Sequence, residues 1–129
     1  MNKTAAVSAL FAVAALYDGL LGLAFLVAPA AIFERAGITP PGHMGYAQFP
    51  GALLVVFGLM FLSIALRPGE GRRLIPYGIG LKVSYVGIVG YYWFAVGIPM
   101  LWKPFAICDL VFIALFAWAY FRLARLSIA

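Results

Sequence analysis

Four apolar stretches with almost no charge dominate the chain, and they cover about residues 5–28, 46–66, 74–96 and 104–123. Each is close to the roughly 20 residues that a helix needs to cross about 30 Å of hydrocarbon. Barrel strands would be shorter and would alternate polar with apolar residues, and lipid admits no other backbone than helices and closed barrels. The pattern therefore predicts an all-α integral membrane protein, an antiparallel four-helix transmembrane bundle forming one domain over residues 1–129.

The composition excludes other classes of protein. Only 10% of the residues are charged and 66% are hydrophobic, whereas soluble domains carry about 25% charged residues. A soluble enzyme, a nucleic-acid-binding domain and a disordered tail are excluded on this ground. The excess of nine Lys and Arg over four Asp and Glu then belongs to loops beside a membrane, and we expect no nucleic-acid partner.

The positive charges are distributed unequally between the two sides of the membrane. Four spans place both termini and the 67–73 loop on one side, with six cationic residues: Lys3, Arg67, Arg72, Arg73, Arg122 and Arg125. The opposite side has two, Arg35 and Lys103. The positive-inside rule predicts a multi-pass protein of the cell membrane with both termini in the cytoplasm. The first stretch is too long for the apolar region of a signal peptide, so we expect it to remain as a span.

The loops follow from these limits. Residues 67–73 (RPGEGRR) read as a short turn, which would make the second and third helices antiparallel neighbours. The outer loop, 29–45, contains a candidate interfacial helix at 30–36, with Ile32 and Phe33 in lipid and Glu34 and Arg35 in water. Four aromatic residues near the second outer loop predict an interfacial belt: Tyr91, Tyr92, Trp93 and Trp102.

Three charges lie inside spans: Asp18, Lys82 and Asp109. Each costs roughly 2.5–3.5 kcal/mol there, so each should face the interior of the bundle and find a partner. The two acids have a similar depth, and the long stem of Lys82 could reach them or extend to the cytoplasm. Two interpretations stay open: a structural ion pair that fixes helix register, and a polar ligand site or proton-carrying carboxylate.

Aromatic residues share the helix faces of these charges. Tyr85 lies one turn from Lys82, and Phe112 lies one turn from Asp109. They outline an aromatic-walled small-molecule cavity, against the alternative of an ordinary packed core, which the abundance of aromatic residues favours. We take Asp18, Lys82, Tyr85, Asp109 and Phe112 as candidate ligand-binding residues.

Motifs for metal binding or catalysis are scarce. One His and one Cys form neither a zinc site nor a Cys-His dyad, so we predict no metal site. The single histidine, His43, lies in the outer loop as a candidate gate or as a solvated side chain.

Small residues mark candidate helix contacts. Ala15, Gly19 and Gly22 line the first span, and Gly80, Ser84 and Gly87 line the third. Such spacing lets helices approach closely, within the chain or between chains.

Three segments resemble DoxX-like small membrane proteins: LYDGLLGLAFLVAP (16–29), LKVSYVGIVGYYW (81–93) and CDLVFIALFAWAYFRLAR (108–125). The resemblance implies an antiparallel four-helix bundle and a role as partner subunit in membrane redox complexes, and no catalytic motif of that family maps onto this chain. Small multidrug transporters are similar in outline only, through an acid in the first span.

The predicted function is an accessory or interaction subunit, held by the Asp18, Lys82 and Asp109 network, with a pocket of lipid or quinone size. We lean against an enzyme and predict no cofactor other than a lipid or quinone. The expected partners are the lipid bilayer and either a membrane complex or a second copy of the chain. The alternative is a small proton-coupled transporter or membrane-embedded enzyme that uses Asp18 or Asp109 as proton carrier.

Overall fold

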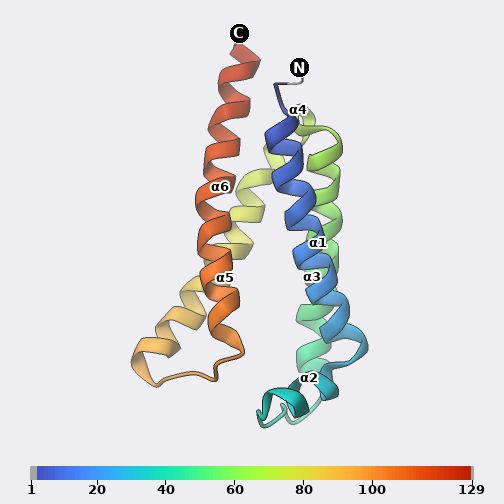
Figure 1. Ribbon diagram of the computed structural model, residues 1–129, viewed down its shortest axis with the longest axis vertical. Helices are drawn as coiled ribbons and strands as arrows, with labels where there is room; N and C mark the ends of the chain where they lie inside the picture. Colours follow the sequence, from blue (N-terminus) through green and yellow to red (C-terminus); the bar gives the residue numbers. More distant parts are fainter. Residues whose placement is uncertain (1–2, 129) are drawn as a thin grey trace.

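The computed structural model describes residues 3–128, which form helices and loops without any strand (Figure 1). Four segments are long and apolar enough to cross a membrane, and the predicted all-α, multi-pass character is confirmed to that extent. The helices are α1 (Ala5–Val27), α2 (Pro29–Ala36), α3 (Gly45–Leu66), α4 (Pro68–Gly71), η1 (Arg72–Leu74), α5 (Ile75–Ala95) and α6 (Trp102–Ile128).

The structure differs from the prediction at both ends of the fourth long helix and in the segment 67–73. Helix α6 begins at Trp102 rather than at Pro104 and continues past residue 123 to Ile128. Pro104 is in the first turn, where a backbone N–H has no partner within the helix and its loss costs little. The segment 67–73, predicted as a plain turn, contains the single-turn helices α4 and η1.

Helix α2 forms where the amphipathic pattern predicts it. It begins at Pro29, a residue suited to the first helical position. It ends at Gly37, whose φ of +68° is left-handed and favours glycine. Phe33 was expected in lipid and is instead buried in the protein against Phe25 and Trp102. The apolar face of α2 therefore covers the end of the helix bundle.

The long helices associate in two pairs, α1 with α3 and α5 with α6. In Figure 1 these pairs approach each other at the end where α1 begins and α6 ends, and diverge toward α2. We call these the terminal end and the cavity end. Helices α3 and α5 were expected to be neighbours, but they touch over a short length only, near Phe61 and Gly78.

Glycines explain the close pairing of α1 and α3. A Cβ atom on Gly22 would lie 2.5 Å from the carbonyl oxygen of Gly51, and one on Gly58 would lie 3.0 Å from Cα of Gly19. Only glycine permits this approach of two backbones. The second predicted stripe behaves differently, because added Cβ atoms on Gly80 and Gly87 of α5 would meet nothing within 4 Å.

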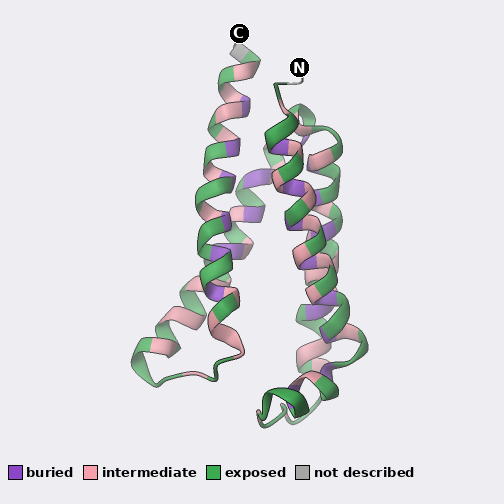
Figure 2. Ribbon diagram, viewed as in Figure 1, coloured by how far each residue is buried: buried purple, intermediate pink, exposed green. Residues whose placement is uncertain are grey.

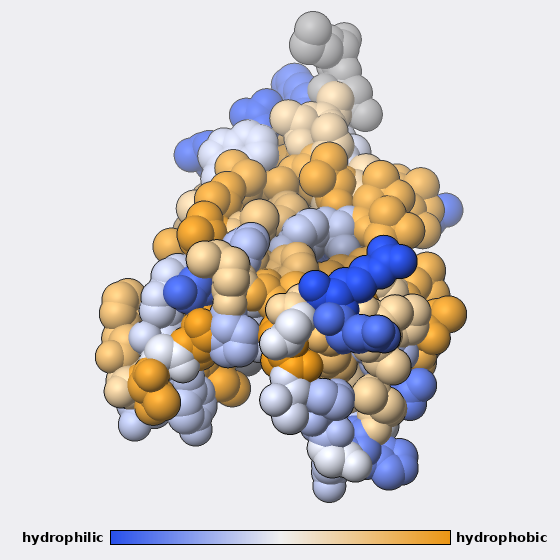
Figure 3. Space-filling view, turned by 60° about the horizontal axis from the view of Figure 1, so that its bottom comes forward, coloured by the Kyte–Doolittle hydropathy of each residue, from blue (hydrophilic) through white to orange (hydrophobic). Residues whose placement is uncertain are grey.

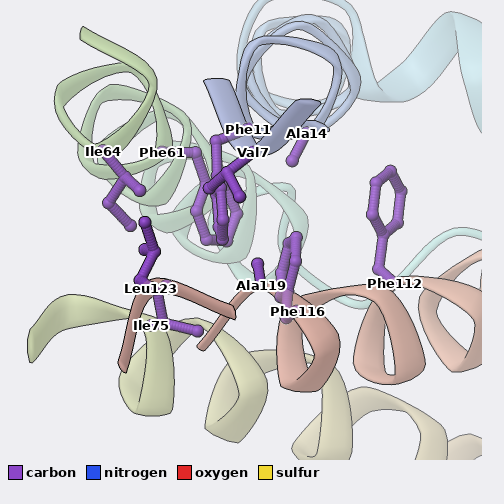
Figure 4. Close-up of a cluster of buried hydrophobic side chains, with 10 residues drawn as sticks. All are labelled: Val7, Phe11, Ala14, Phe61, Ile64, Ile75, Phe112, Phe116, Ala119 and Leu123. Carbon is purple, nitrogen blue, oxygen red and sulfur yellow. The ribbon is translucent and has the colours of Figure 1, made fainter. Parts of the chain in front are cut away.

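The core lies near the terminal end, where side chains from all four long helices point toward one another (Figure 4). The rings of Phe11 and Phe116 stack at 4.7 Å between centroids, and Phe61 lies 5.2 Å from Phe116. Buried positions face inward, whereas the outward faces are exposed and largely apolar (Figures 2 and 3). This distribution suits helices whose outer surface contacts lipid.

Candidate functional site

The three charged side chains predicted inside the spans meet in the structure. The Nζ atom of Lys82 lies 2.8 Å from both carboxylate oxygens of Asp18 and 2.9 Å from Oδ1 of Asp109. Lys82 and Asp18 are 1% exposed and Asp109 is 7% exposed. We call these three residues the ion trio; it joins the two helix pairs, because Asp18 belongs to α1 whereas Lys82 and Asp109 belong to α5 and α6.

Helix geometry explains how the trio assembles. The buried residues of α1 recur every three or four positions, which places Asp18 on the inner face. At about 1.5 Å per residue, Lys82 lies about 10 Å along α5 and Asp18 about 20 Å along α1, both measured from the terminal end. The lysine stem therefore extends toward the cavity end rather than back to the nearer surface.

Aromatic rings surround the ammonium group. Its Nζ lies 4.9 Å from the ring centroid of Phe112 and 5.1 Å from that of Tyr17. Cation–π attraction is larger when the cation is removed from water, as it is here. The rings and the two carboxylates together satisfy a lysine that has no contact with solvent.

A cavity of about 580 Å³ lies directly beside the trio. Asp18 and Asp109 form part of its lining, and most of the remaining surface is apolar. Its walls come from α1, α2, α3, α5, α6 and the loop after α2. Figure 3 views the cavity end and shows the α2 side and the loop between α5 and α6 as two lobes separated by a notch. The volume lies within the roughly 300–1,000 Å³ typical of small-molecule sites.

Trp102 and Tyr85 organise the wall near the cavity end. The Tyr85 hydroxyl donates a hydrogen bond to the carbonyl oxygen of Trp102 at 3.0 Å. The Trp102 ring stacks on Phe25, with centroids 6.0 Å apart. Trp102 was expected in a lipid-facing belt and instead lines the cavity, because α2 folds over this end and supplies Phe33 as a partner.

The candidate ligand-binding residues differ in their position relative to the cavity. Asp18, Tyr85 and Asp109 line the cavity. Lys82 lies behind the carboxylates and does not line it, and Phe112 belongs to the buried core rather than to the cavity wall.

The candidate gate His43 lies outside the cavity lining. Its exposed ring accepts a hydrogen bond at Nδ1 from the Gly45 backbone N–H at 3.0 Å. This contact is made at the first residue of α3, where a backbone N–H has no partner within the helix. Among the described residues, no group of three His, Cys, Asp or Glu side chains could hold a metal ion.

Several cavity residues were missed in the sequence. Tyr17 precedes Asp18 and lines the cavity, and Phe33 and Thr39 reach it from the long outer connection. Tyr46 reaches it from the first turn of α3. The amphipathic pattern of 30–36 indicated that one face of that segment would be covered. The prediction assigned that face to lipid, whereas Phe33 is covered by protein.

Comparisons with protein-family models, with curated proteins and with solved structures gave no match for this chain.

Proposed function

We propose that this chain is a small integral membrane protein that binds an amphipathic molecule of lipid or quinone size in the cavity between its helix pairs. The observation that carries this proposal is a mostly apolar cavity that ends on two buried carboxylates. An apolar wall with a few fixed polar groups is the usual composition of a ligand site, since the polar groups set the orientation of the ligand. The aromatic side chains Phe25, Trp102 and Phe105 offer flat surfaces to such a molecule.

Quenching of Trp102 fluorescence tests this proposal. In a Trp93→Phe, Trp118→Phe background, Trp102 is the remaining tryptophan of the chain and lines the cavity. In phosphatidylcholine nanodiscs, an alkyl amphiphile brominated on its chain should quench it saturably. Ala47→Phe, which adds a ring at the cavity wall, should abolish the saturable part. Ala114→Phe, the same change on an exposed position of α6, should leave it intact; quenching that rises linearly in every variant would refute the site.

We propose that this binding protein acts as an accessory subunit of a membrane complex. The exposed stripe of Gly80, Ser84 and Gly87 on α5 supports it, because small residues let a second helix approach closely. The resemblance to DoxX-like proteins favours a partner complex in the cell membrane over a second copy. Purification in mild detergent should yield a stoichiometric partner that Ser84→Leu releases, and repeated recovery of a lone chain would contradict the role.

A small proton-coupled transporter is the second candidate. The specific observation in its favour is that two cavity carboxylates share one ammonium group, so a proton could be held or released at the cavity. It predicts that Asp18→Asn and Asp109→Asn remain folded and inserted but lose proton-coupled movement of the ligand. If both variants bind the ligand and no ligand crosses proteoliposomes even in the unmodified protein, this candidate is refuted.

A further inference from the structure

We propose that the ligand of this cavity is an amphipathic organic cation, with an ammonium group at Asp109 and Asp18 and an apolar chain along Leu21 and Phe105. The inference rests on the proposed function and adds to it the charge and hydrogen-bonding character of the ligand.

The first support is the charge balance of the ion trio. Two carboxylates face one ammonium group, which leaves one negative charge in excess when all three groups are ionised. The excess is buried, since the side chains of Asp18 and Asp109 are 1% and 10% exposed. An uncompensated buried charge is unfavourable, and a cationic ligand beside the two acids compensates it.

The second support is the inventory of hydrogen-bonding groups at the cavity. Lys82 donates to both acids and the Tyr85 hydroxyl donates to Trp102, so these two donors are occupied. Among the described residues, the buried hydroxyl of Tyr17 in the cavity lining has no hydrogen-bond partner and can donate or accept. The buried Oδ2 of Asp18 has no hydrogen-bond partner within residues 3–128, although the Lys82 Nζ lies 2.8 Å from it. The cavity thus offers an acceptor to its ligand. An ammonium group supplies donors, whereas a quinone head group supplies acceptors only.

The third support separates a simple cation from a zwitterion. In the described part of the chain, no Lys or Arg lines the cavity, so a phosphate next to the ammonium group would find no cationic partner there. A free amphipathic amine in its protonated form fits this lining better than a zwitterionic phospholipid. Aromatic faces at Tyr17, Trp102 and Phe105 also suit an organic cation, since ring faces attract positive charge.

The apolar chain of the ligand has a path on the outer surface. A shallow apolar groove beside α1, lined by Val13, Leu16 and Leu20, shares Tyr17, Leu21 and Phe105 with the cavity. These three shared side chains form the wall between cavity and groove. An amphiphile that arrives through the bilayer therefore meets the groove first and reaches the carboxylates by displacing this wall.

A series of three probes tests the proposal in the Trp102-only protein in phosphatidylcholine nanodiscs. The probes have the same brominated dodecyl chain and end in a primary ammonium, hydroxyl or carboxylate group. We expect the cation to quench Trp102 with an apparent Kd roughly 10- to 100-fold below that of the alcohol, per mole of probe in the bilayer, as a charge-assisted contact provides. The carboxylate should bind weakest.

Matched variants test whether the preference for the cation depends on the charge at the site or on the net charge of the whole protein. Asp109→Asn and Asp18→Asn each remove the excess charge and should bring the cation and the alcohol to similar affinities. Glu34→Gln makes the same acid-to-amide change on the exposed side of α2, outside the cavity lining, and should preserve the preference. If both aspartate variants fail to fold, the probe series in the unmodified protein still tests whether the ligand is a cation.

The outcomes distinguish the two proposals. Equal saturable quenching by cation and alcohol would overturn the proposal that the ligand is a cation, and it would still support an amphiphile-binding site. No saturable quenching by any probe overturns both. Adding phosphatidylethanolamine to the nanodiscs identifies the source: competition with the cation assigns the ammonium group to a lipid headgroup, and no competition assigns it to a free amphiphile.

Discussion

Lys82 makes every polar contact of the ion trio, so single-residue changes there have the largest expected effects. Its ammonium group bonds to two carboxylates that would otherwise face each other in a buried site. Removal of one partner from a buried ion pair costs more than replacement of all partners by neutral groups, because the charge left behind has no compensation.

We predict that Lys82→Met lowers the free energy of unfolding by roughly 3–5 kcal/mol. The triple variant Asp18→Asn, Lys82→Met, Asp109→Asn should recover most of that loss, since it leaves no buried charge. Unfolding in mixed detergent micelles, followed by circular dichroism, measures both. Lys103→Met is the matched control and should cost only about 0.5–1 kcal/mol, because Lys103 contacts the Trp93 ring at 5.2 Å and, among residues 3–128, no acid. Purely additive losses in the triple variant would contradict direct contact.

Sequence alone could predict which charges turn inward, but it left open whether Lys82 reaches the two acids. It predicted less well which neighbours line a cavity. Asp18, Lys82 and Asp109 had to turn inward because lipid penalises them. Phe112 shares a face with Asp109, yet it is buried in the core, whereas Phe105 on the same face lines the cavity. The difference arises because the two helix pairs diverge toward the cavity end. The residue spacing on a single helix does not reveal that divergence.

At the level of helices, the approach of α1 to α3 depends on glycine at particular positions rather than on small residues in general. Gly22 is in backbone contact with α3, while an added Cβ on Gly19, one turn earlier, would meet nothing within 4 Å. The two glycines are therefore a matched pair within one stripe.

We predict that Gly22→Ala lowers the free energy of unfolding by roughly 1–3 kcal/mol, since the methyl group must push the helices apart. Gly19→Ala should be neutral or stabilising by up to about 1 kcal/mol, because alanine favours the helix. Thermal unfolding in detergent compares the two variants directly. Equal losses at both positions would show that the close approach at Gly22 is not what holds the pair.

The two small-residue stripes show a limit of sequence interpretation at this scale. Both have small residues at helical spacing, but only the α1 stripe contacts another helix of the chain. The partner stripe Gly51 and Gly58 on α3 was not singled out in the sequence. A pattern on one helix indicates that it can be approached closely; only the complementary pattern identifies the helix that does so.

For the whole molecule, the even number of spans and the contact of Arg122 with the backbone of Lys3 at 3.2 Å place the start of α1 and the end of α6 at the same end. The terminal end has the larger number of cationic side chains. The orientation proposed from this asymmetry puts that end in the cytoplasm.

Thiol labelling should confirm this orientation. In a Cys108→Ser background, Ser127→Cys places a thiol at the terminal end and Gly42→Cys places one at the cavity end, both at exposed positions. A membrane-impermeant maleimide should label Gly42→Cys in intact cells and Ser127→Cys only after permeabilisation. The reverse pattern would invert the proposed topology and make the cavity open toward the cytoplasm.

The arrangement of the pairs was less predictable than the number of spans. Hydropathy predicts where the helices are, because each must be apolar along a bilayer thickness. It does not specify which helices touch, since lipid and protein are equally apolar neighbours. The short connection between α3 and α5 suggested that these two helices pack along their length. Instead, α3 packs along α1 and touches α5 over a short length only.

The separation of the trio along the chain has a consequence for biosynthesis. Asp18 is made 64 residues before Lys82, and Asp109 follows 27 residues later. At roughly 5–20 residues per second, the ribosome leaves the first carboxylate without its partner for about 3–13 s. During that interval the nascent α1–α3 hairpin carries an acid in the membrane that nothing neutralises except a proton. The charge of Asp18 can thus be compensated by Lys82 only after α5 has been made.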